Sequence, residues 1–153
     1  MKKTLLIIIA VLIVAGLGII WQLKSKQSVK VSGENIGNEL EKQDLIRLTN
    51  PQPNDIIKSP LVITGEARGS WFFEASFPVI LTDWDGLIIA QGVAKAQSEW
   101  MTEDFVPFTA TLLFKNPAYP KNKNNGSLIL KKDNPSGLPA HNDALEISIL
   151  FGQ

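Results

Sequence analysis

The sequence predicts an all-β fold, an antiparallel β-sandwich of about seven strands, preceded by one transmembrane helix. Two patterns predict the sandwich. From residue 45 onward apolar residues alternate with polar ones, which is typical of strands that bury one face. Turn-forming residues interrupt this alternation at short intervals. A third pattern, an uncharged apolar run near the N-terminus, predicts the helix.

Residues 1–24 predict a membrane anchor. Every residue from Leu5 to Trp21 is apolar or glycine, and only Gln22 interrupts the run before Leu23. A helix needs about 20 such residues to cross the hydrocarbon of a bilayer, and Trp21 falls where interfacial aromatic residues are enriched. A cleaved signal peptide is the alternative, but its apolar stretch is usually about 7–15 residues. We therefore expect a retained single-pass anchor.

Charge is segregated along the chain. Five basic residues and no acidic ones lie before residue 31, whereas residues 31–153 carry 10 basic and 15 acidic side chains, a net charge of −5. A domain with a net negative charge repels the phosphate backbone of nucleic acids, so we expect no nucleic-acid partner. The early basic residues flank the apolar segment almost equally on both sides, which suits lipid head groups but does not choose an orientation.

Residues 25–44 predict a polar tether, because they contain few large apolar residues and no strand alternation. A short helical turn is expected at 38–43. The domain that follows, residues 45–153, contains the alternating segments and is long enough to bury one core. Its expected strands are 45–48, 61–64, 75–81, 87–93, 108–114, 128–130 and 145–151.

The breaks between these segments carry turn chemistry. Residues 83–86 end in Gly86 and predict a hairpin with glycine at positive φ. Asn125-Gly126 predicts a similar turn, and residues 51–55 and 134–137 are further breaks. Pro78 lies inside a strand pattern and lacks a backbone donor, which predicts an edge strand or a bulge.

Several of these motifs together resemble a known family. They are Ser59–Gly69, Trp71–Ala75, Asp83 with Gly86, Trp100, Pro107–Ala110, Gly126–Leu128 and Ile147–Phe151. Over about Ile46–Phe151 the chain resembles the immunoglobulin-like domain of bacterial spore germination. The resemblance implies an immunoglobulin-like sandwich with an extracytoplasmic, envelope-associated role, and it implies no catalytic residues. Such domains often lie beside other modules, and we expect no such module in this chain.

Candidate reaction chemistry is sparse. The absence of cysteine excludes disulfides, thiolate nucleophiles and cysteine metal sites. His141, the single histidine, is expected in an exposed loop, and Asp83 with Asp85 lacks the closing bidentate glutamate of a calcium loop. Glu66 and Glu74 leave one alternative, because two carboxylates about 5–9 Å apart can hydrolyse a glycosidic bond. A structural ion pair with Arg68 competes with that interpretation.

We therefore expect no enzyme activity, no cofactor and no metal, and predict a binding module at the cell membrane with its domain outside. The partner is expected to be an envelope protein or polysaccharide. A polysaccharide would use exposed aromatic platforms with nearby polar groups, and a protein would use an apolar patch or the edge strand at Pro78. A structural spacer and a glycan-active enzyme remain alternatives. The candidate ligand-binding residues are Trp71, Trp84, Trp100, Glu66 and Arg68.

Overall fold

The computed structural model describes residues 37–118 and 123–152. The predicted anchor and tether residues 25–36 lie outside this range, and no helix within it is long and apolar enough to span a bilayer. The elements are α2 (Glu39–Lys42), β1 (Ile46–Asn50), β2 (Ile56–Ile57), β3 (Leu61–Arg68), η1 (Gly69–Trp71), β4 (Ser76–Asp83), β5 (Ile88–Ala96), β6 (Phe105–Leu112), β7 (Asn125–Lys131), η2 (Pro139–His141) and β8 (Ala144–Phe151).

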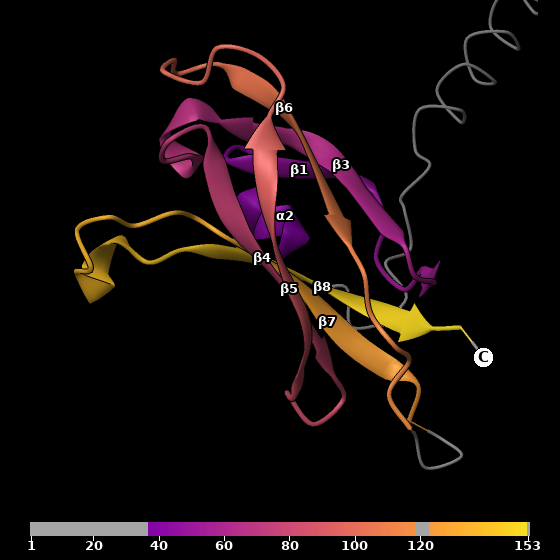
Figure 1. Cartoon of the computed structure of the whole chain (residues 1–153). Helices are drawn as coiled ribbons and strands as arrows, with labels where there is room; N and C mark the ends of the chain where they lie inside the picture. Colours follow the sequence, from indigo (N-terminus) through magenta and orange to yellow (C-terminus); the bar gives the residue numbers. More distant parts are fainter. Residues whose placement is uncertain (1–36, 119–122, 153) are drawn as a thin grey trace, which may run out of the picture. The chain divides into compact units, whose positions relative to one another are not determined.

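The strands form one curled sheet in the order β1-β3-β6-β5-β4-β7-β8-β2 (Figure 1). The prediction of an all-β fold is confirmed, and each of the seven expected segments contributes a strand. The eighth strand, β2, was not expected, because its two isoleucines are too short a run to show alternation. It pairs with β8 in parallel, so the sheet is not antiparallel throughout.

The sheet narrows between β5 and β6. These strands are joined at only two register positions, Lys95↔Thr109 and Ala96↔Phe108, whereas β3 and β6 pair along their full length. The curl brings β6 toward β4, where the rings of Phe77 and Phe108 meet edge to face with centroids 4.9 Å apart. Phe72 adds a second edge contact to Phe77 at 5.2 Å. The two halves of the sheet thus close around one core.

The predicted alternation matches the observed burial. In β8 the residues Leu145, Ile147, Ile149 and Phe151 are fully buried, whereas the intervening side chains are exposed or half-buried. The same alternation runs along β3 and β6. Because side chains on a strand alternate between faces, each buried row defines a matching outward row.

Pro78 predicts an edge strand or a bulge, and the edge strand is wrong. Strand β4 does have a register shift against β5, between Leu81 and Thr82. Strand β4 lies inside the sheet, between β5 and β7. The ladder with β7 begins only at Val79, paired with Leu130, so Pro78 precedes it and removes none of its hydrogen bonds. The sheet ends instead at β1 and β2.

The two glycine turn predictions have opposite outcomes. Gly86 has φ of +80° and closes the β4–β5 hairpin, as expected. Gly126 is not in a turn: it lies in β7, paired with Asp83 on one side and Ile149 on the other. A Cβ at this position would lie 2.2 Å from the carbonyl oxygen of Thr82. Close approach of two strands, rather than a turn, therefore requires glycine there.

Residues 37–44, which belong to the predicted tether, contact the domain. The backbone N–H of Asn38 donates to the carbonyl of Glu146 at 3.0 Å. Its side-chain amide donates to the carbonyl of Ala144 and accepts from the N–H of Glu146, at 2.9 and 2.8 Å. The expected helical turn is present as α2, and Lys42 forms an ion pair with Asp143 at 2.6 Å. The segment therefore covers part of the open side of β8.

We predict that Asn38→Ala lowers the free energy of unfolding by about 1–3 kcal/mol, because it removes both side-chain hydrogen bonds to β8. Urea unfolding of a soluble chain that starts at residue 35 measures this. Leu40→Ala is the matched control in the same segment, since Leu40 is 61% exposed, and it should change stability by about 0.5 kcal/mol or less. Equal stabilities for the two variants would show that residues 37–44 do not support the fold.

Candidate functional site

Polar and charged side chains gather on the outward face of β3 and β6. The residues Ile63 and Ala67 of β3 and Val106 and Phe108 of β6 are buried, so their neighbours point outward. The strand register extends this face onto β1 and β5. We call it the β3–β6 outer face. It comprises Arg47, Val62, Thr64, Glu66, Arg68, Val93, Lys95, Phe105, Pro107, Thr109 and Thr111.

Two arginines contact one aromatic ring at one end of this face. The Cζ atom of Arg47 lies 4.0 Å from the ring centroid of Phe105, and that of Arg68 lies 4.1 Å from it. Each contact is a cation–π interaction, worth about 0.5–1 kcal/mol at an exposed site.

The predicted partners of Arg68 differ from those observed. Glu66 pairs with Arg47, across strands β1 and β3, at 3.1 Å between Nη1 and Oε1. Arg68 instead donates to two backbone carbonyls, those of Asp44 at 3.1 Å and Glu103 at 3.0 Å. Glu66 thus forms its ion pair with Arg47, which is distant in sequence, and not with the expected partner Arg68. Only the strand register brings Arg47 opposite Glu66.

The alternative of a glycosidase built on Glu66 and Glu74 finds no supporting geometry. Glu66 is held by Arg47 on the β3–β6 outer face. Glu74 is exposed in the connection between η1 and β4, with φ of 49°. Neither residue lines the cleft beside Phe72 and Lys132 or the cleft beside Ser59 and Phe114.

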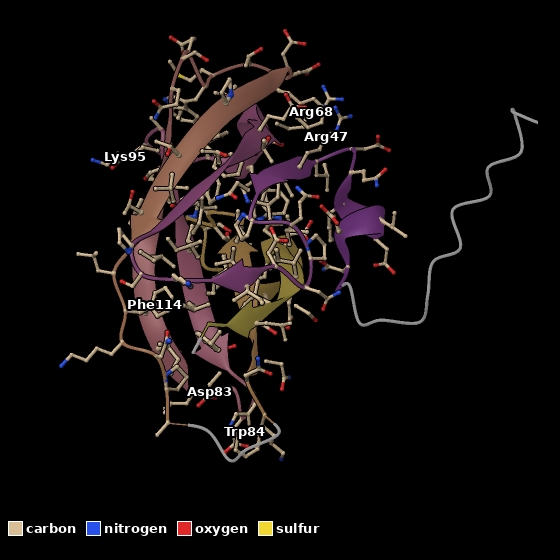
Figure 2. The ribbon with its side chains drawn as sticks, turned by 90° about the vertical axis from the view of Figure 1, so that its right-hand side faces the viewer. Arg47, Arg68, Asp83, Trp84, Lys95 and Phe114 are labelled. Atoms are coloured by element: carbon tan, nitrogen blue, oxygen red, sulfur yellow. The ribbon has the colours of Figure 1, made fainter. Side chains whose placement is uncertain are left out.

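The three candidate tryptophans do not form one platform. Trp71 is 1% exposed and belongs to the core, where its indole N–H has no hydrogen-bond partner among the described residues. Trp100 is half-buried and packs against the same core. Trp84 is 37% exposed at the β4–β5 hairpin, and Figure 2 shows it at the opposite end of the domain from Arg47 and Arg68.

The hairpin at Trp84 is organised by Asp83. One carboxylate oxygen of Asp83 accepts the backbone N–H groups of Asp85 and Leu87, both at 2.9 Å. The ammonium of Lys123 lies 3.8 Å from the centre of the Trp84 ring. Asp83 therefore stabilises the turn, and no cluster of three or more metal-ligating side chains occurs in the described part of the chain.

The structure brings one serine to His141 that the sequence did not indicate. The Oγ of Ser136 lies 3.1 Å from Nδ1 of His141 and 2.5 Å from Oδ1 of Asn134. Both residues border a cleft of about 370 Å³ beside Phe72 and Lys132. A catalytic serine–histidine pair needs a third group to orient the imidazole. Within the described residues no carboxylate forms a hydrogen bond with His141. The contacts of Ser136 with His141 and Asn134 therefore stabilise the conformation of the loop.

A second cleft, of about 440 Å³, lies at the far end of β6. It is lined by Lys58, Ser59, Phe114, Lys115, Asn116 and Gly152. The Ser59 hydroxyl accepts the backbone N–H of Phe114 at 3.0 Å, and the ring of Phe114 packs on that of Phe151. These contacts attach the segment after β6 to the core. No local sequence pattern indicates this cleft, because its residues come from three separate segments.

This domain is an all-β curled sheet of immunoglobulin-like type. It has a charged outer face, and hydrogen bonds hold its loops in place. Residues 45–137 match the family model of the immunoglobulin-like domain of bacterial spore germination, and the chain belongs to that family. The predicted resemblance is confirmed. The match ends before β8, although the motif at Ile147–Phe151 does form the last strand. Comparison with curated proteins and with solved structures finds no match.

We predict that Trp71 and Trp84 respond differently to truncation. Trp71→Ala should lower the free energy of unfolding by about 3–5 kcal/mol, because it empties a buried site. Trp84→Ala should lower it by about 1 kcal/mol or less, because only surface contacts are lost. Urea unfolding followed by far-UV circular dichroism measures both variants. Similar losses for the two would contradict the assignment of Trp71 to the core and Trp84 to the surface.

Proposed function

We propose that this protein is a non-catalytic binding module of the bacterial cell envelope, held at the membrane by its N-terminal segment with the domain outside. Membership of the immunoglobulin-like family is the observation that carries the proposal. Sandwich domains of this type commonly bind through loops or a sheet face rather than perform chemistry.

The anchor rests on the sequence, and the outside location rests mainly on the family. The apolar run from Leu5 to Leu23 has the length of a membrane span. The family description, a domain of bacterial spore germination, supports a place at the cell surface without assigning this chain to germination. A tether between anchor and domain lets the domain sample nearby envelope components.

The surface of the domain supports binding more than catalysis. The β3–β6 outer face offers guanidinium, ammonium and hydroxyl groups on adjacent strands. Glu66 and Glu74, the carboxylates of the glycan-active alternative, line neither the cleft beside Phe72 nor the cleft beside Phe114. A structural spacer remains the second candidate, favoured by the contacts of residues 37–44 with β8, which join the tether to the fold.

Topology is tested by adding protease to intact cells that express the chain with a C-terminal epitope. We predict that the epitope is lost without lysis, while the membrane retains the N-terminal segment. Protection of the epitope until lysis would place the domain inside. Release of an intact soluble domain that begins near Lys24 would support signal-peptide cleavage.

Binding is tested by passing solubilised envelope extract over the immobilised full chain. An unrelated immunoglobulin-like sandwich of similar net charge is the control. We predict that a protein or a glycan is retained by this chain and not by the control. Equal retention by both would favour the spacer.

A further inference from the structure

The β3–β6 outer face has a charge opposite to that of the domain. Acidic side chains outnumber basic ones by 15 to 10 in residues 31–153. On this face the ratio is reversed, with Arg47, Arg68 and Lys95 against Glu66 alone. Glu66 is already paired with Arg47. The face therefore presents positive charge on a domain that otherwise repels anions.

We propose that the β3–β6 outer face binds a polysaccharide that carries carboxylate groups, an inference that rests on the proposed function and names its partner. The charge of the face is complementary to such a polymer, and its hydroxyl groups match the hydrogen-bonding surface of a sugar chain.

The two arginines are positioned before any ligand arrives. Each guanidinium uses Nε and Nη1 in hydrogen bonds: Arg47 to Gln43 and Glu66, and Arg68 to Asp44 and Glu103. In the described residues neither Nη2 donates to a protein group. These donors are therefore available on side chains whose rotamers are already restricted, which lowers the entropy lost on binding. The Arg47–Glu66 pair shows that a carboxylate fits beside this cluster.

The face extends well beyond the arginine cluster. Thr64, Thr109 and Lys95 lie side by side on β3, β6 and β5. This row is four residues along β6 from Phe105, which corresponds to about 13 Å on an extended strand. Lys95 is exposed and has no ion pair among the described residues. Positive groups at both ends of a hydroxyl-bearing strip suit an extended anionic chain better than a single small molecule.

The composition of the face favours a glycan over a protein partner. Centres of protein interfaces are depleted in charge and contain large aromatic or aliphatic anchors. Here Phe105 contacts two arginines, and the apolar side chains exposed on the face, Val62 and Val93, are small. The larger exposed apolar side chains Trp84 and Leu87 lie on the β4–β5 hairpin. Figure 2 shows Lys95 toward the arginine end of the domain and Trp84 at the other end.

The test measures retention of the full chain, purified in detergent, on three immobilised polymers. Polygalacturonate carries carboxylates, polyglycerol phosphate carries phosphates, and dextran is uncharged. We expect retention on polygalacturonate above both others, weakening as salt rises. Lys95→Gln should weaken binding about threefold to fivefold, the effect of one exposed charge pair. Arg47→Lys should also weaken it, because the charge stays but the planar fork is lost.

Lys131→Gln is the matched control, since Lys131 is an exposed strand lysine on β7, away from this face. It removes the same charge and should leave binding within about twofold of the unmodified chain. Equal losses for Lys95→Gln and Lys131→Gln would overturn the inference by showing a non-specific charge effect. Retention on polygalacturonate no better than on dextran, or better retention on polyglycerol phosphate, would overturn it as well. If the envelope extract still yields a partner, only this inference fails and the proposed function stands.

Discussion

The rings of Phe77 and Phe108 contact each other inside the core that the two halves of the sheet share. Strands β5 and β6 share only two register positions, and the N–H of Gln97 after β5 adds one backbone hydrogen bond to Pro107 of β6. The rings meet edge to face at 4.9 Å, and Phe72 extends the contact to η1. Burial of these side chains stabilises the closed sheet because packing, unlike a ladder, does not require adjacent strands.

Closure of the sheet decides what faces outward. With Phe108 in the core, Thr109 and Phe105 must lie on the outer side of β6, and the β3 register then places Arg68 beside Phe105. The candidate binding face is thus a consequence of core packing and strand register. Close approach of strands also requires glycine at position 65, because a Cβ there would lie 2.2 Å from the carbonyl oxygen of Arg47 on β1 and 2.8 Å from the ring of Phe108. Residues 37–44 complete the arrangement by covering part of β8.

Alternation and turn chemistry were sufficient to predict seven of the eight strands, because burial on one face leaves a period of two in the sequence. Tertiary contacts override local signals where the predictions failed. Asn125-Gly126 is a strong turn signal, yet Gly126 serves strand approach inside β7. The candidate site was only partly predictable. Arg68 and Glu66 are on the outer face, but the register supplies Arg47 and Phe105, and no local pattern tells buried Trp71 from exposed Trp84.

A double-mutant cycle between Phe77 and Phe108 tests most directly whether core packing holds the two halves together. The single variants Phe77→Leu and Phe108→Leu and the double variant are unfolded in urea, in a chain that starts at residue 35. We predict a coupling energy of about 0.5–1.5 kcal/mol between the two positions, the value of an edge-to-face pair. A coupling energy of zero, with each single variant nearly as stable as the unmodified domain, would contradict this account.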